Sequence, residues 1–181
     1  METYDRVNQF LGNRILEIGC GGGQLAQEIC SKIKVERYVG FEVNSRLTRD
    51  MIDNPPDNFE FVKTNAHDVR YNPRGMFVVV PEGEFNTVIG KSWMTHVTMN
   101  VLSTYTAWFA KRLCSGGHMI QTCFIDEELA GSFDAGCLHT YYSRESLENL
   151  SEHFELISVD MGGWVGGIHF APHDIAVWRR L

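Results

Sequence analysis

The chain has 181 residues, of which 44% are hydrophobic and 22% are charged. That length fits one domain of roughly 150 residues, and the near-average composition excludes a disordered chain, a collagen-like repeat and a coiled-coil rod. The net charge of −7, without a cluster of basic residues, argues against nucleic acid or an anionic membrane surface as a partner.

Short apolar runs alternate with amphipathic stretches along the whole chain, a pattern typical of βαβ units. In the first half, residues 14–18, 38–42 and 59–62 are predicted strands. The glycine-rich stretch 19–23 is followed by apolar residues at helical spacing from Leu25 to Ile33, which predicts a helix. Ser45 is expected to cap a second, short helix.

The second half predicts strands at 85–89, 118–124, 154–159 and 175–178. Residues 99–113 carry the longest helical pattern, which Gly116-Gly117 would close, and Ser143 would cap a helix over 144–150. The last two strands are joined by a loop without a helical period, so we expect them to pair as an antiparallel hairpin. The chain is therefore predicted to form a seven-stranded, mostly parallel α/β sheet with an antiparallel last strand.

Three connections in this pattern are unusually long, at 70–84, 126–140 and 161–173. The first contains its own apolar run at 76–80, which predicts an extra strand or a flap. Ligands of open α/β sheets bind at the carboxyl ends of the strands. We therefore expect ligand recognition from these three loops.

The strongest local signal is the glycine-rich turn from Glu17 to Gly23 after the first strand. Glycines there let the backbone pass close to a ligand, and the following helix offers free N–H groups. Gln24 stands where the dinucleotide-binding fingerprint needs a small residue. Glu42 ends the second strand, where its two oxygens can accept hydrogen bonds from both hydroxyls of a ribose.

The stretch Leu16-Glu-Ile-Gly-Cys-Gly-Gly-Gly-Gln-Leu25 resembles the E/D-x-G-x-G-x-G motif of class I S-adenosylmethionine-dependent methyltransferases. Further landmarks of that family follow in order: the acidic ribose-binding position, an adenine-reading loop at 65–68, the strand 85–89 and the turn 113–117. The resemblance implies a Rossmann-like fold with helices on both faces of the sheet. It also implies S-adenosyl-L-methionine as cofactor and S-adenosyl-L-homocysteine as product. The implied cofactor-binding residues are Glu17, Gly19, Cys20, Gly21, Gly23, Glu42, Val43, Asn65, Ala66, His67, Lys91 and Ser92.

The sequence departs from the family pattern at several positions. Asn65 stands where Asp is usual, so a neutral and weaker acceptor would face the adenine amine. Cys114 and Ser115 replace Lys and Pro in the turn before the fifth strand. Because the first predicted strand begins at residue 14, we expect residues 1–181 to form a single methyltransferase domain with a minimal amino-terminal lid. A larger parent chain and a homo-oligomer stay open.

Two short stretches resemble a subset of these enzymes, many of which methylate sugars in bacterial glycans or glycosylated natural products. Ser92-Trp-Met-Thr-His96 is similar to their S-x-F-T-H stretch. Residues 172–178 are similar to their ending, in which a polar-Asp pair precedes the last strand. This resemblance implies methyl transfer to a hydroxyl of a small acceptor, a sugar or a terminal glycan residue.

An alcohol acceptor must lose its proton, which requires a nearby base. His96 is the first candidate, because imidazole has an ordinary pKa of about 6.5 and this residue follows the fourth strand by one short loop. His139 and His169 are alternative bases in the later loops. Ring faces suit the C–H surface of a sugar. The aromatic residues expected near the acceptor are Trp93, Tyr141, Tyr142 and Trp164.

A divalent metal is a further alternative, which the sequence does not favour. Asp126, Glu127 and Asp134 could supply the oxygen ligands that hard cations take, but acidic loop residues are usually just solvated.

Other functions also stay open. An N- or carboxyl-methyltransferase of a small metabolite would share the cofactor features. A nicotinamide-dependent oxidoreductase would need a small residue at position 24, and a non-catalytic relative would not need the intact glycine turn.

The five cysteines are odd in number and form no C-x-x-C pair, so they indicate neither a disulfide framework nor a zinc site. The first residues are acidic, which is unlike a secretory signal. The longest aliphatic run falls far short of the roughly 20 residues that a bilayer requires. We therefore expect a cytoplasmic protein without a membrane partner.

Overall fold

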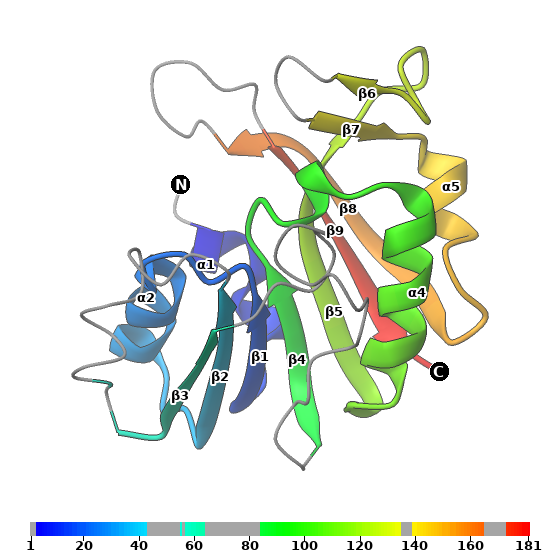
Figure 1. Cartoon of the computed structure of the whole chain (residues 1–181). Coiled ribbons are helices and arrows are strands. Elements are labelled where there is room, and N and C mark those ends of the chain that lie inside the picture. The colour runs from blue at the N-terminus through cyan, green and yellow to red at the C-terminus, as the bar shows by residue number, and fades with distance from the viewer. Residues whose placement is uncertain (1–2, 43–54, 56, 64–83, 135–138, 165–172) are drawn as a thin grey trace.

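The computed structural model describes residues 3–42, 55, 57–63, 84–134, 139–164 and 173–181. Within these residues, seven strands form the main sheet in the order β3-β2-β1-β4-β5-β9-β8 (Figure 1). Their bounds are β1 Arg14–Ile18, β2 Arg37–Glu42, β3 Phe59–Lys63, β4 Phe85–Gly90, β5 Leu113–Ile125, β8 Phe154–Trp164 and β9 His173–Arg180. Strands β1 to β5 pair in parallel, whereas β9 runs antiparallel to both of its neighbours. The predicted seven-stranded sheet with an antiparallel last strand is confirmed.

Two further short strands follow β5, where we expected a polar loop over 126–140. β7 (His139–Tyr142) pairs in parallel with the last two residues of β5, and β6 (Phe133–Asp134) pairs antiparallel with β7. Thr140 and Tyr142 are the buried residues of β7 and alternate with half-buried ones. Strands this short carry too few residues for a two-residue period to stand out in a sequence.

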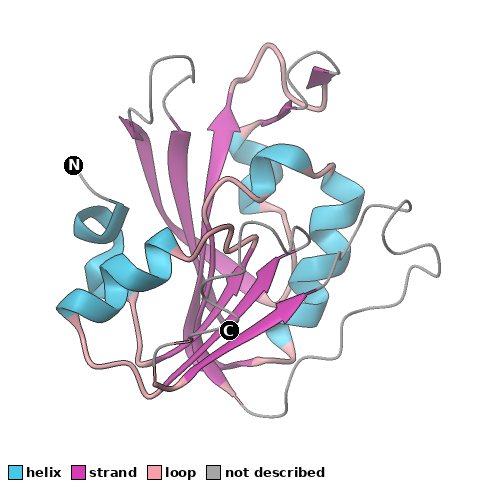
Figure 2. Ribbon diagram, turned by 60° about the vertical axis from the view of Figure 1, so that its left-hand side comes forward, coloured by secondary structure: helices cyan, strands magenta, loops and turns pink. Residues whose placement is uncertain are grey.

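Helices cover both faces of the sheet, as predicted (Figures 1 and 2). α1 (Thr3–Val7) and α2 (Gln24–Lys32) lie on one face, and α4 (Met99–Ala110) and α5 (Arg144–Glu148) lie on the other. In α2 and α4 the buried side chains recur at three- and four-residue spacing, so each of these helices turns one apolar stripe toward the sheet. The buried helix side chains include Val7, Leu25, Ala26 and Ile29 on the first face and Leu102, Phe109 and Leu147 on the second.

The long helix α4 ends at Ala110, whereas we predicted it to continue to Leu113. Leu113 instead begins β5, and the pairing of β5 with β4 shifts register a few residues later. A Cβ on Gly117 would lie 2.9 Å from the carbonyl oxygen of Asn86, so only glycine permits this approach of the two strands. Gly116-Gly117 therefore lies within β5, where the pairing with β4 is irregular, and not at the end of α4 as predicted.

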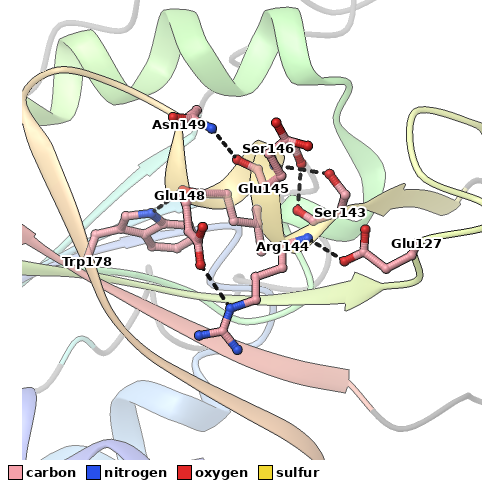
Figure 3. Close-up of polar contacts among 9 residues, drawn as sticks. Glu127, Ser143, Arg144, Glu145, Ser146, Glu148, Asn149 and Trp178 are labelled. Atoms are coloured by element: carbon pink, nitrogen blue, oxygen red, sulfur yellow. Dashed lines mark hydrogen bonds and ion pairs between the residues drawn. The ribbon is translucent and has the colours of Figure 1, made fainter.

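Helix α5 begins where the sequence predicts it (Figure 3). The Ser146 N–H donates to the Ser143 hydroxyl oxygen at 3.0 Å, which makes Ser143 the N-cap. The indole N–H of Trp178 on β9 donates to the carbonyl oxygen of Leu147 at 2.9 Å and joins this short helix to the sheet.

None of the described helices is long and apolar enough to cross a membrane. The 3-10 helices η1 (Asn8–Phe10) and η2 (Met94–His96) complete the described elements. The helix predicted after Ser45 and the apolar run 76–80 lie outside the described residues.

Candidate functional site at the carboxyl edge of the sheet

The sheet has a topological switch point between β1 and β4, which are neighbours at its centre. From β1 the chain continues to β2 and β3 on one side, and from β4 it continues to β5 on the other. Ligands of open α/β sheets bind at the carboxyl edge beside such a point. Because β9 is antiparallel, its first residues lie at this same edge, near the end of β5 (Figure 1).

The glycine turn between β1 and α2 has left-handed backbone at alternate positions. Gly19, Gly21 and Gly23 have φ angles of +71°, +53° and +77°. A Cβ on Gly19 would lie 3.3 Å from the Cβ of Trp93, whereas a Cβ on Gly21 would meet no described atom within 4 Å. Gly23 is the N-cap of α2 and offers no side-chain acceptor. The turn therefore presents open backbone and helix N–H groups at the ligand edge.

Glu42 at the end of β2 holds this turn in place. One of its carboxylate oxygens accepts a hydrogen bond from the Gly21 N–H at 2.8 Å. The Cys20 N–H donates to the carbonyl oxygen of Phe41 at 2.9 Å, so the turn is attached to β2 at two points. Because a carboxylate offers about four acceptor positions, Glu42 can hold the turn and also accept from a ligand hydroxyl.

Glu17 lies beneath the same turn and is 1% exposed. Its carboxylate accepts a hydrogen bond from the Tyr38 hydroxyl at 2.5 Å. Burial raises the pKa of Glu17 to about 7, although the Tyr38 hydrogen bond and the charge of Lys91 both act to lower it. A buried carboxyl group with a strongly raised pKa at the ligand edge of a sheet is typical of a functional site.

The segment after β4 is held in an unusual conformation. Ser92 has a φ of +64°, which is rare for a residue other than glycine. Its N–H donates to the hydroxyl oxygen of Thr122 at 2.6 Å, and its carbonyl oxygen accepts from the Thr95 hydroxyl at 2.7 Å. Such strain persists only where the surroundings fix it, and it concentrates at functional sites. Lys91 and Ser92 directly follow β4, so they lie at the carboxyl edge of the sheet.

Trp93 is a core residue, which corrects the expectation that its ring faces the acceptor. It is 7% exposed, and its ring centroid lies 5.2 Å from that of Tyr105 and 6.1 Å from that of Phe109. The left-handed turn at Ser92 directs the chain back toward α4, so the indole enters the space between that helix and the sheet. Trp93 also lies close to the glycine turn, because a Cβ added at Gly19 would come within 3.3 Å of the Trp93 Cβ.

Histidines gather at the carboxyl end of β5. His96 is exposed at the end of η2, and its ring centroid lies 5.9 Å from that of half-buried His139 on β7. The Phe124 ring lies 4.7 Å from His139 and 4.6 Å from the ring of His173. The structure therefore brings His96 and His139 together.

His173 is a member of this cluster that the sequence reasoning missed. It is 5% exposed, and its Nδ1 lies 3.4 Å from the Ser92 hydroxyl oxygen. Burial lowers the pKa of His173 to about 4, and the nearby His139, His96 and Lys91 lower it further, so the ring is neutral at physiological pH. The sequence did mark this position, because His173-Asp174 is the polar-Asp pair at the last strand. We interpreted that pair as a family landmark and not as part of the site.

The acidic residues after β5 act as acceptors for local backbone. The Asp126 carboxylate accepts from the N–H groups two and three residues further on, at 2.9 and 3.0 Å. Glu127 accepts from the Arg144 N–H at the start of α5, at 2.9 Å (Figure 3). Among the described residues, no three His, Cys, Asp or Glu side chains are grouped in a way that could hold a metal ion. The side chain of Asp134 is outside that description.

Several predicted site residues also lie outside the described part of the chain. They are Val43, Asn65, Ala66, His67 and His169. Trp164 ends β8 and pairs with His173 through its backbone, while its side chain is not described. Tyr141 is half-buried on β7, and its ring centroid lies 5.7 Å from that of Phe124.

No protein-family profile and no curated protein sequence matches this chain significantly. Solved structures match it over almost its whole length. An S-adenosylmethionine-dependent methyltransferase from Methanosarcina mazei superposes with a TM-score of 0.69 at 17% identity, covering 100% of this chain and 99% of that one. An amino pentose methyltransferase from Micromonospora echinaspora, involved in calicheamicin biosynthesis, gives a TM-score of 0.68 at 14% identity over 98% and 88%. The N-methyltransferase NodS from Bradyrhizobium japonicum gives 0.65 at 15% identity over 96% and 89%.

The chain therefore has the fold of class I S-adenosylmethionine-dependent methyltransferases, as predicted. At these identities the likeness shows the fold alone, and any activity has to be argued from the residues of the site.

Proposed function

We propose that this protein is an S-adenosylmethionine-dependent methyltransferase that acts on a hydroxyl group of a small acceptor. The observation that carries this proposal is the left-handed glycine turn at the switch point, open at Gly21 and fastened to Glu42. That arrangement offers backbone to a ligand on one side and a carboxylate acceptor on the other.

The residues at this edge suit the proposed cofactor, which when bound supplies a methyl group carried on a positively charged sulfur. Glu42 would accept from the ribose hydroxyls, and the glycine turn with the start of α2 would lie along the cofactor. The carboxylate of Glu42 provides negative charge that favours a cationic ligand. We expect residues 65–67 to contact the adenine and Lys91 and Ser92 to lie beside the methionine end.

The histidine pair supplies what an alcohol acceptor needs. With that cofactor bound, transfer of its methyl group to an alcohol oxygen would require the acceptor proton to move to a base of the protein. We propose His96 as that base, with His139 beside it at a ring separation of 5.9 Å. A neutral His173 beneath them adds no competing positive charge.

A sugar or terminal glycan residue is the acceptor that we favour. Support comes from the likeness of Ser92–His96 to the stretch found in sugar methyltransferases and from the amino pentose methyltransferase among the structural matches. Tyr141, at the same end of the sheet, and Trp164 would offer ring faces to it. The described cysteines are free thiols, which fits a reducing compartment such as the cytoplasm.

Calorimetric titration of the purified chain with S-adenosylhomocysteine and with NAD tests the class of cofactor. We expect micromolar binding of S-adenosylhomocysteine and none of NAD, and the reverse would overturn the proposal. Transfer of a labelled methyl group onto a panel of sugars and small metabolites then identifies the acceptor, and labelling of amines only would redirect the proposal to N-methylation.

Substitution of the histidines tests the role of the base. His96→Ala should leave the affinity for S-adenosylhomocysteine within a few-fold while turnover falls by roughly 10²–10⁴. His153→Ala is a matched control, because His153 is exposed beyond α5 and outside the site. If His96→Ala retains full turnover while His139→Ala loses it, the base is His139.

A further inference from the structure

A small pocket lies beside the histidine pair, between the start of α4 and the β6–β7 ribbon, which Figure 1 shows next to each other. Its volume is about 200 Å³, below the roughly 300–1,000 Å³ of pockets that hold a whole ligand, so it suits one functional group. No residue that lines it carries a charged side chain. The lining residues are Thr98, Met99, Asn100, Gly131, Ser132 and Thr140.

The start of α4 provides hydrogen-bond donors to this pocket. Thr98 is the N-cap, and its side chain makes no capping hydrogen bond. The Leu102 N–H donates the first backbone hydrogen bond of the helix, to the Thr98 carbonyl oxygen. The backbone N–H groups of residues 99–101 therefore have no acceptor within the helix, and the helix dipole places partial positive charge there.

Thr140 provides a second and independent indication of a ligand. It is 3% exposed, and its hydroxyl oxygen has no hydrogen-bond partner among the described residues. Tyr142, two residues along the same face of β7, shows the usual outcome: its buried hydroxyl donates to the carbonyl oxygens of Met94 and Val97. A buried hydroxyl without a partner in a native structure needs an explanation, and an ion or ligand group that completes its hydrogen bond is one such explanation.

We propose that this pocket binds the carboxylate or phosphate group of an acidic acceptor. Hydroxyls, an amide and the helix N–H groups form its polar lining, and such a set of donors at a helix start fits an oxyanion. The overall negative charge of the chain opposes anions at long range, but no carboxylate belongs to the lining. This inference rests on the proposed function, because it names the class of acceptor for that site.

The pocket and the histidine pair are neighbours on two separate segments. Thr98 follows His96 by two residues, and Thr140 directly follows His139. Adjacent residues of a strand point to opposite faces, so the two sites flank β7. An acceptor with its acidic group in the pocket could reach round the short ribbon and place a hydroxyl at the histidines. Sugar acids and sugar phosphates therefore suit the site better than neutral sugars.

Titration of the whole chain with inorganic phosphate and with acetate, followed by NMR, tests the pocket without a need for turnover. We expect millimolar binding with shifts at the start of α4 and on β7. Thr140→Val removes the hydroxyl at nearly constant volume and should weaken binding by about tenfold. Thr106→Val is the matched control, because this buried threonine lies on α4 outside the pocket and should change nothing. Absence of binding to either anion, or equal binding by Thr140→Val, would overturn the inference.

Labelled methyl transfer then decides which acid the acceptor carries. Sugar phosphates, sugar acids and neutral sugars are compared, and we expect Thr140→Val to raise the KM of the acidic acceptors only. Preference for phosphates or for acids identifies the source of the oxyanion, and equal use of neutral sugars overturns the inference. Failure of S-adenosylhomocysteine to bind would contradict the proposed function alone, since anion binding is scored separately.

Discussion

The carboxylate of Glu42 accepts a hydrogen bond from the N–H of Gly21 at 2.8 Å. Gly21 is the position of the glycine turn where an added Cβ would meet no described atom within 4 Å, so this bond joins the end of β2 to the point where the turn is open. The conformation of the turn and the proposed contact to the ribose thus depend on the same side chain.

Replacement of Glu42 by Gln should separate these two tasks. The amide oxygen of Gln can still accept from the Gly21 N–H, but the negative charge and one acceptor oxygen are lost. Because hydrogen bonds to charged groups contribute about 1.5–3 kcal/mol, we expect Glu42→Gln to weaken binding of S-adenosylhomocysteine by roughly 10- to 100-fold. Calorimetric titration measures the change, and thermal unfolding should show that the fold persists.

Glu36→Gln is the matched control for this experiment. Glu36 is an exposed glutamate next to the opposite end of β2, so the same chemical change occurs away from the turn. Its affinity should equal that of the unaltered chain. Equal affinities for both variants would show that Glu42 does not hold the cofactor.

The raised pKa of Glu17 predicts a specific dependence of stability on pH. Between the ordinary value of 4.5 and about 7, the folded chain binds this proton more tightly than the unfolded chain. The contribution of Glu17 to the free energy of unfolding is therefore full below pH 4.5 and falls as the pH rises through about 7, by up to roughly 3 kcal/mol. Glu17→Gln should gain stability relative to the unaltered chain over that window, as measured by urea unfolding.

Tyr38→Phe checks the cause of this dependence. The Tyr38 hydroxyl donates to Glu17 and lowers its pKa, so its removal should move the window to higher pH. A difference between Glu17→Gln and the unaltered chain that stays constant with pH would contradict the assignment. If the pH range over which stability falls is the same in Tyr38→Phe, the hydroxyl of Tyr38 does not contribute to the pKa of Glu17.

Local patterns were enough to predict the main elements. The apolar run at Arg14–Ile18 forms β1 over the same residues, because a buried parallel strand needs apolar side chains on both faces. Ser143 caps α5 because capping is a contact between residues three apart. The end of α4 was misplaced because Gly116-Gly117 meets β4, a partner that is distant in the sequence.

The candidate site was predictable only where a motif marks it. The glycine turn and Glu42 stand out in the sequence, whereas the histidine cluster depends on Phe124, which packs between rings from β7 and β9. His173 reaches the site because β9 is antiparallel and starts at the ligand edge. Trp93 was expected beside the acceptor because nothing in the local pattern reports the left-handed backbone at Ser92.

The left-handed Ser92 should respond differently to glycine and to alanine. Both changes remove the hydroxyl, but only glycine adopts a φ of +64° without a steric penalty. We expect Ser92→Gly to be more stable than Ser92→Ala by about 1 kcal/mol in urea unfolding. Equal stabilities would show that the conformation at this position relaxes in the alanine variant.

Thr122→Val tests what holds Ser92 in place. Thr122 is 4% exposed, and its hydroxyl oxygen accepts from the Ser92 N–H at 2.6 Å. Valine keeps the shape of the side chain but leaves that N–H without its acceptor. The free energy of unfolding should fall by about 1–3 kcal/mol. A variant as stable as the unaltered chain would show that the Ser92 N–H finds another acceptor.

Tyr142 positions the proposed base through its hydroxyl. That hydroxyl is buried and donates to the carbonyl oxygens of Met94 and Val97, which lie on either side of His96 along the chain. Burial raises the pKa of Tyr142, so it stays a donor at physiological pH. Tyr142→Phe should lower the free energy of unfolding by about 1–3 kcal/mol and reduce turnover, while the affinity for S-adenosylhomocysteine stays unchanged.

Tyr141→Phe separates this positioning effect from a general effect of the ribbon. Tyr141 lies on the other face of β7 and is half-buried, so loss of its hydroxyl should change the free energy of unfolding by no more than about 0.5 kcal/mol. The kinetic constants add a second readout: Tyr142→Phe should lower kcat through His96, whereas Tyr141→Phe keeps its ring face and should leave both kcat and the KM of the acceptor nearly unchanged. If the two variants lose kcat equally, the hydroxyl of Tyr142 has no specific part in placing His96.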